Sequence, residues 1–205
     1  MATENDELSW ESQLEACQQA IDYRFNDLEI LRRCLTHSSS APTRLDSNER
    51  LEFLGDAVLG MILAERLFRL FPDEEEGKLT QARSVLARGE QLCSLARKLK
   101  LQQAILMNTG EMRSKGNERD STLEDAIEAV VAAVYLDGGM RATRKTVLSW
   151  YGDLDKILSS AMDNYNPKGR LQELSQALHG PEQIRYVVDR EEGPPHNKMY
   201  TVSVK

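Results

Sequence analysis

The run from Asn48 to Asp56, NERLEFLGD, constrains the fold of this chain more than any other stretch. Its acidic residues Glu49, Glu52 and Asp56 are three and four positions apart, so on a helix they share one face about one turn apart. The residues that follow, 57–63, are all apolar or glycine, which predicts a largely buried helix. Because a buried carboxylate is costly unless a cation pairs with it, the pattern indicates a metal, a basic partner or a reaction at this helix.

A second segment has the same character. Asp125 and Glu128 are three positions apart, and no further charge follows until Asp137. Ala129 and Ala132 flank these acids on the same face, and their small side chains would let another helix approach closely. We therefore expect the two acidic helices to bring their carboxylates into one cluster.

The expected cluster consists of the carboxylates of Glu52, Asp56, Asp125 and Glu128. Hard oxygen ligands of this kind suit Mg²⁺ or Mn²⁺. Zinc is disfavoured because His37, His179 and His196 all lie outside both helices. No Glu-x-x-His pair, as in a di-iron bundle, is present.

A structural alternative stays open for the same acids. They could form buried salt bridges to arginines such as Arg50, Arg83 or Arg88. In either case the carboxylates are expected to be enclosed, because apolar residues such as Phe53 and Leu59 flank the acidic face. A solvated face would carry Lys or Gln at these positions.

Composition sets wider limits. The formal net charge of −7 taken alone argues against a nucleic-acid binder, although local patches decide contacts and the acidic count includes the cluster itself. The three cysteines are odd in number and widely spaced, so we expect no disulfide framework and a reducing compartment. The acidic N-terminus does not resemble a signal peptide, and no stretch approaches the roughly 18 apolar residues of a membrane span. These features predict a cytoplasmic protein with no membrane segment.

Helical periodicity dominates the chain as far as Met162. It predicts helices over 11–21, 28–35, 49–71, 77–87, 90–98 and 121–136, and one or two more between 140 and 160. Asp46 with Glu49, and Ser121 with Glu124, are expected to cap the two acidic helices. Polar loops are expected over 36–47 and 108–120.

The pattern changes after Tyr165. A short helix is predicted over 168–178, and β-branched or alternating stretches predict strands over 184–188 and 199–204. We therefore expect a mainly α protein with a helical domain over 1–163 and a small helix–strand–strand module over 164–205.

The motifs resemble those of the ribonuclease III family. NERLEFLGDAVLG is similar to the family signature, and the D-x-x-E of the second acidic helix is similar to its second acidic motif. Further similar segments occur in family order between about residues 10 and 160: LTHSS at 35–39, GKLT at 77–80, the loop 110–121 and LDGG at 136–139.

This resemblance implies an all-helical endonuclease domain whose metal ligands are Glu52, Asp56, Asp125 and Glu128. Asp56 and Glu128 would be the catalytic acids among them, and Glu49 a supporting acid. The implied reaction is hydrolysis of phosphodiesters in double-stranded RNA to 5′-phosphate and 3′-hydroxyl ends, with Mg²⁺ as cofactor and Mn²⁺ as its substitute. The resemblance also implies a homodimer, with Phe53 as a candidate contact, and processing of ribosomal RNA precursors and other RNAs.

The last 40 residues resemble the beginning of a double-stranded RNA-binding domain. By that resemblance Gln172, Glu173 and His196 would touch the RNA minor groove. The chain stops at Lys205, before the third strand and second helix that such a domain would add.

Two other functions are possible for the whole chain. One is a non-catalytic RNA-binding or scaffold protein, which would be expected to lose one of the four acids. The other is an unrelated helical metalloprotein, which the lack of histidine ligands disfavours.

Overall fold

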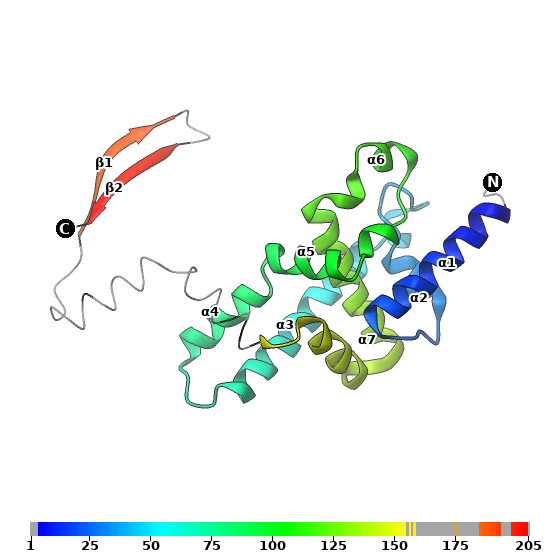
Figure 1. The fold of residues 1–205 in the computed structure, drawn as a ribbon, viewed down its shortest axis with the longest axis horizontal. Coiled ribbons are helices and arrows are strands. Elements are labelled where there is room, and N and C mark those ends of the chain that lie inside the picture. Colours follow the sequence, from blue (N-terminus) through cyan, green and yellow to red (C-terminus); the bar gives the residue numbers. More distant parts are fainter. Residues whose placement is uncertain are drawn as a thin grey trace. The chain divides into compact units, whose positions relative to one another are not determined.

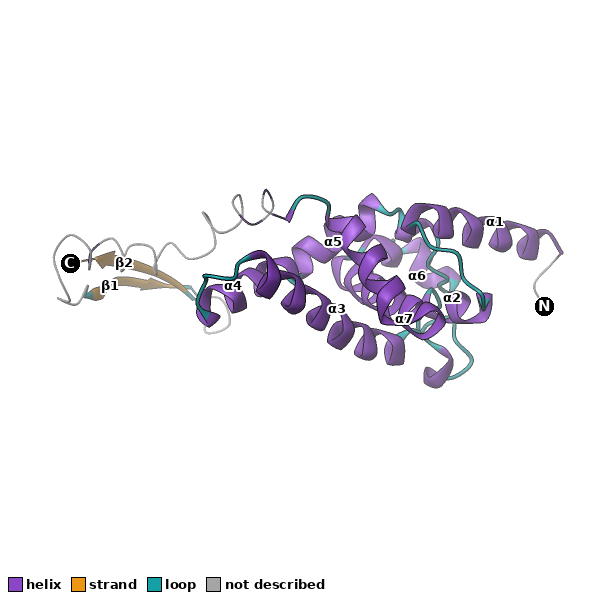
Figure 2. Ribbon diagram, turned by 90° about the horizontal axis from the view of Figure 1, so that it is seen from below, coloured by secondary structure: helices purple, strands orange, loops and turns teal. Residues whose placement is uncertain are grey.

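The computed structural model describes residues 4–154, 156, 158, 175, 185–193 and 198–204. Contacts within the chain divide it into two compact units, Met1–Leu158 and Ser159–Lys205 (Figure 1). The first unit is helical, and the described part of the second consists mainly of two antiparallel strands (Figure 2). The predicted mainly α fold class is therefore confirmed. No helix in the described ranges is long and apolar enough to cross a membrane.

The first unit is built from α-helices and short 3₁₀ turns in the order α1 (Glu4–Ile21), α2 (Leu28–Cys34), η1 (Arg44–Asp46), α3 (Glu49–Leu70), α4 (Glu76–Leu86), α5 (Gly89–Lys98), η2 (Leu101–Gln103), α6 (Thr109–Arg113), η3 (Gly116–Glu118) and α7 (Asp120–Tyr151). The bounds of α2, α3, α4 and α5 lie within one residue of those predicted, whereas α1 begins seven residues earlier than predicted and α7 continues past the break expected after residue 136. The region predicted as a polar loop over 108–120 instead contains α6 and η3, because Asn108 caps α6 by accepting the Glu111 N–H at 2.8 Å.

The helices α3 and α7 form the centre of this unit and pack against each other more extensively than any other pair of its elements. On α7 the stretch 129–134 has no exposed surface at all. On α3 the buried side includes Val58, Ile62 and Leu63. At Gly55 the two backbones touch, since a Cβ there would lie 1.8 Å from the Glu128 carbonyl oxygen.

Both predicted capping boxes are wrong. Asp46 accepts a hydrogen bond from the Thr43 hydroxyl at 2.7 Å, and α3 begins after Asn48 without a side-chain cap. The helix α7 begins after Arg119, also without a side-chain cap. In both places the sequence pattern is present, but the acidic side chain does not complete it.

The glycine pair after Asp137 bends α7 but does not end it. Gly139 has φ 70° and ψ 174°, and the helix then resumes to Tyr151. The Asp137 carboxylate accepts hydrogen bonds from the Tyr23 hydroxyl at 2.7 Å and from the Asp27 N–H at 2.9 Å. This acid therefore ties the loop between α1 and α2 to the bend in α7.

The second unit contains two antiparallel strands, β1 (Tyr186–Glu192) and β2 (Met199–Val204), with an irregular register between Val188 and Arg190. The predicted second strand matches β2, and β1 extends further along the chain than expected. The helix predicted over 168–178 lies outside the described residues apart from Ser175.

Candidate active site

The four predicted metal ligands lie on the segments of α3 and α7 that touch each other. Glu52 and Asp56 lie on either side of Gly55 along α3, and the contact at Gly55 falls on the backbone of Glu128 in α7. Asp125 lies one turn before Glu128 on the same helix. The Asp56 side chain is exposed and the other three are half-buried, so the sequence-based expectation of a fully enclosed cluster is wrong on the Asp56 side.

Electrostatic interactions show that these carboxylates share one region. Burial, followed by the charges of Asp56 and Glu124, raises the pKa of Glu128 to about 8. Burial and the charge of Asp125 raise the pKa of Glu52. Burial and the charge of Glu124 raise the pKa of Asp125. Loss of solvent and mutual repulsion thus act in the same direction on three of the four acids.

No salt bridge joins the cluster to a basic side chain within the described part of the chain. None of the salt bridges formed there involves Glu52, Asp56, Asp125 or Glu128. Arg50 and Arg83 are exposed, and Arg88 pairs with Glu90 at 3.4 Å. Within the described residues, no salt bridge therefore supports the structural alternative for these acids.

The donor set suits a hard divalent cation. Carboxylate oxygens are the preferred ligands of Mg²⁺, and their repulsion here is the interaction that a cation would relieve. Among the described residues, no group of three or more His, Cys, Asp or Glu side chains is placed so that it could hold a metal ion. The acids fit a metal by the chemistry of their oxygen donors.

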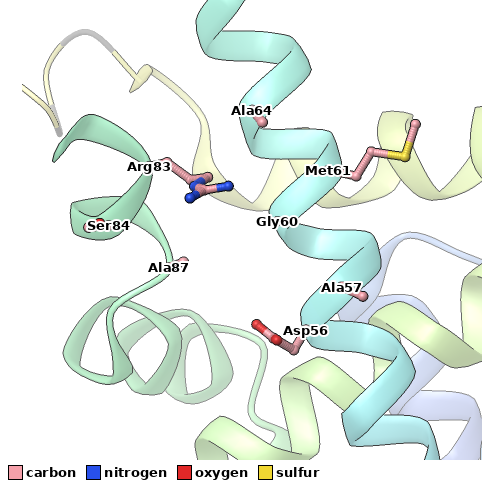
Figure 3. Close-up of a pocket in the computed structure, with 8 residues that line it drawn as sticks. All are labelled: Asp56, Ala57, Gly60, Met61, Ala64, Arg83, Ser84 and Ala87. Atoms are coloured by element: carbon pink, nitrogen blue, oxygen red, sulfur yellow. The ribbon is translucent and has the colours of Figure 1, made fainter. Parts of the chain in front are cut away.

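A cavity of about 470 Å³ opens beside Asp56, between α3 and α4 (Figure 3). The Asp56 carboxylate and the Arg83 guanidinium reach into it from opposite helices. The rest of its lining is small or flexible: Ala57, Gly60, Met61, Ala64, Ser84 and Ala87. Asp56 is thus accessible to a ligand from this side.

Three residues near the cluster were not assigned a role there by the sequence reasoning. Glu124, expected to be a capping residue, contributes to the raised pKa of Glu52, Asp125 and Glu128. Its carboxylate lies at the start of α5, 2.7 Å from the position of a Cβ on Gly89. The charge of His37 lowers the pKa of Asp125.

These residues differ in the sequence signal that could have revealed them. The third of these residues is Gly55. Its sequence signal is that it is the glycine within the acidic motif. Glu124 precedes the acidic pair directly. His37 lies in a different segment, so no spacing rule connects it with Asp125.

The predicted supporting acid, Glu49, is half-buried at the start of α3, and its charge contributes to the raised pKa of Glu52. The predicted RNA-contacting residues Gln172, Glu173 and His196 lie outside the described residues.

The raised pKa of Glu128 has a consequence for stability without metal. A carboxyl group whose pKa rises from 4.5 in the unfolded chain to about 8 in the folded one stabilises the fold while it is protonated. That contribution is complete below pH 4.5 and is lost as the pH rises to about 8. We expect the melting temperature of the metal-free protein to fall between pH 5 and pH 8, and Mg²⁺ to raise it again at pH 8. An unchanged melting temperature on adding millimolar Mg²⁺ at pH 8 would contradict this.

Comparison with known proteins gives consistent results. A family model described as Ribonuclease-III-like matches residues 27–154. Ribonuclease 3 of Vibrio atlanticus is 38% identical over 191 residues, which cover 93% of this chain and 83% of that protein. Ribonuclease 3 of Pseudothermotoga lettingae is 41% identical over 196 residues, which cover 91% of this chain and 81% of that protein.

Solved structures agree. The nuclease domain of ribonuclease III from Campylobacter jejuni superposes with a TM-score of 0.64 at 36% identity, covering 67% of this chain and 94% of that domain. Dicer from Pichia stipitis shares the fold, with a TM-score of 0.51 at 22% identity, covering 89% of this chain and 82% of the Dicer chain. The length and identity of these matches, together with the four acids at the α3–α7 contact, show that the chain belongs to the ribonuclease III family of endoribonucleases.

Proposed function

We propose that this protein hydrolyses phosphodiester bonds of double-stranded RNA in a Mg²⁺-dependent reaction that leaves 5′-phosphate and 3′-hydroxyl ends, with Mn²⁺ as a substitute cation. The observation that supports this most directly is the group of four carboxylates at the α3–α7 contact, to which no described basic side chain is paired. Processing of ribosomal RNA precursors and other RNAs in the cytoplasm is the corresponding cellular role.

In this proposal the two helices divide the work of holding the cation. Glu52 and Asp56 would hold it from α3, and Asp125 and Glu128 from α7. A bound cation would supply positive charge that lowers the pKa of water and neutralises the charge on the departing 3′ oxygen. Glu49 lies one turn before Glu52 on α3 and would add negative charge beside the cation as a supporting acid. Without a cation, the acids would repel an RNA phosphate, so metal binding also reverses the sign of the local charge.

A cleavage assay on a labelled RNA duplex tests this function. We expect cleavage with Mg²⁺, none in excess chelator, and no comparable cleavage of single-stranded RNA or of duplex DNA of the same sequence. Mapping of the product ends should show 5′-phosphates. Absence of cleavage at every Mg²⁺ and Mn²⁺ concentration, or equal cleavage in chelator, would refute the proposal.

We propose that the active form is a homodimer joined through one face of α3. Phe53, Met61 and Phe68 are 82%, 56% and 71% exposed, although each is apolar. Their spacing of eight and seven residues places them on one side of the helix, with Ala57 and Ala64 between them. An exposed apolar stripe of this kind is typical of an interface. The nuclease domain from Campylobacter jejuni has a region involved in dimer formation.

Replacing Phe53 with Lys is expected to give a monomer at micromolar concentration. In a two-fold symmetric interface the change occurs twice, so a loss of about 2 kcal/mol at each site weakens association about 1,000-fold. Sedimentation or light scattering would measure the mass. Leu45→Lys is the control, because Leu45 is 62% exposed but lies in η1, outside this face. A Phe53→Lys protein that remains dimeric would show that the interface lies elsewhere.

We also propose the division into a catalytic domain over 1–163 and the first part of a double-stranded RNA-binding domain over 164–205. The antiparallel pairing of β1 and β2 supports this assignment. Gln172, Glu173 and His196 remain its proposed minor-groove contacts.

A further inference from the structure

The segment 35–39 is fixed at the beginning of α3 by backbone hydrogen bonds. The His37 N–H donates to the Leu106 carbonyl at 2.9 Å, and the Leu106 N–H donates to the Leu35 carbonyl at 2.8 Å. The Asn48 N–H, just before α3, donates to the Thr36 carbonyl at 2.9 Å. The backbone of His37 is therefore held between residue 106 and the first turn of an acidic helix.

The imidazole of His37 is oriented by Ser39. Its Nδ1 accepts the Ser39 N–H at 3.1 Å and lies 2.9 Å from the Ser39 hydroxyl. That hydroxyl accepts the Asn108 N–H at 3.2 Å, so its own hydrogen is available for Nδ1. Since both partners present a hydrogen to Nδ1, the neutral ring carries its proton on Nε2.

The Nε2–H is thus a donor with a fixed orientation, and it has no hydrogen-bond partner among the described residues. His37 is half-buried, and when its ring is protonated its charge lowers the pKa of Asp125, although no hydrogen bond joins the two side chains. Ionised carboxylates offer acceptors but no donors. A phosphate held at the cluster would therefore lack donors from the four acids themselves.

We propose that His37 binds the RNA substrate by donating a hydrogen bond from Nε2–H to a non-bridging oxygen of the phosphodiester bound beside Asp125, with Ser39 fixing the ring for this role. The inference rests on the proposed function, since it needs RNA at the carboxylate cluster. A donor to a charged phosphate oxygen forms one of the stronger classes of hydrogen bond. It would also limit rotation of the phosphate and so align the bond to be cut.

The test compares His37→Ala, His37→Gln and His37→Asn in steady-state cleavage of an RNA duplex with Mg²⁺. We expect His37→Ala to lower kcat/KM about 10- to 100-fold, the usual effect of losing a hydrogen bond to a charged group. The amide nitrogen of Gln extends about as far as Nε2, so His37→Gln should recover most of this loss, whereas the shorter Asn should not. Ser38→Ala is the matched control, because no side-chain hydrogen bond is formed by Ser38 in the described part of the chain.

Binding of the same duplex gives a second readout that does not depend on turnover. In a Glu128→Gln background, adding His37→Ala should weaken affinity at least fivefold, and His37→Gln should weaken it less. The inference is overturned if His37→Ala stays within twofold of the parent in both assays. It is also overturned if His37→Gln is as impaired as His37→Ala and both melt well below the parent, which would indicate a structural role.

These outcomes separate the inference from the proposed function. If the parent protein cuts duplex RNA and the His37 variants are unaffected, only the proposed role of His37 is refuted. A parent that binds duplex RNA without ever cutting it refutes the enzymatic function, and the binding assay alone then decides on His37.

Discussion

The Glu128→Gln protein is expected to lose cleavage of duplex RNA by about 1,000-fold or more, which corresponds to about 4 kcal/mol of transition-state stabilisation. The substitution keeps the shape of the side chain and removes one negative charge from a cluster of four carboxylates. Single-turnover cleavage at saturating protein measures this without a contribution from product release. Glu11→Gln is the matched control, because Glu11 is an exposed acid on α1.

The same variant should fold as well as the parent when no metal is present. Burial and neighbouring acids raise the pKa of Glu128 to about 8, so its ionised form is unfavourable in the folded state at high pH. Removing that charge should leave the melting temperature in chelator unchanged or higher, and should reduce the gain on adding Mg²⁺. A marked fall in chelator would instead indicate that Glu128 has a structural partner. Cleavage as fast as that of the parent would show that it is not a ligand.

The Gly55→Ala protein is expected to be destabilised by about 3 kcal/mol or more, a fall in melting temperature of roughly 10 °C. The added methyl group would lie 1.8 Å from the carbonyl oxygen of Glu128 and 2.5 Å from its carbonyl carbon. Both are backbone atoms, so no change of rotamer relieves the overlap, and α3 and α7 have to separate. Cleavage should fall with stability because the two acid pairs separate as well.

Gly77→Ala provides the comparison. Gly77 lies in α4 and nothing stands within 4 Å of a Cβ placed on it. The better helix propensity of Ala should leave this variant as stable as the parent or slightly more stable. Urea unfolding of both proteins measures the difference, and equal stabilities would contradict the close contact between α3 and α7.

Much of the candidate site could be predicted because helical periodicity is a local property. The spacing of Glu52 and Asp56, and of Asp125 and Glu128, already places each pair on one face. That the two faces meet depends on the packing of helices distant in sequence. The sequence predicted that Ala129 and Ala132 of α7 allow a close approach; both are fully buried, and the structure adds Gly55 of α3 as a point where the two backbones touch.

The errors have identifiable physical causes. The capping patterns failed because the acidic side chains make other contacts. Asp46 accepts a hydrogen bond from the Thr43 hydroxyl, and the Glu124 carboxylate lies against α5. The apolar run 57–63 predicted a largely buried helix, yet Met61 within it is exposed. Hydrophobicity alone does not distinguish a core from an interface with another chain.

The bend at Gly139 has a consequence for how the protein loses activity. After the bend, the Trp150 indole donates to the Ile21 carbonyl and the Tyr151 hydroxyl to the Leu86 carbonyl, each at 2.9 Å. The part of α7 before the bend is enclosed by its neighbours and carries the acids, so it cannot open locally without exposing the core. We therefore expect heat to abolish cleavage only as the helical unit as a whole unfolds.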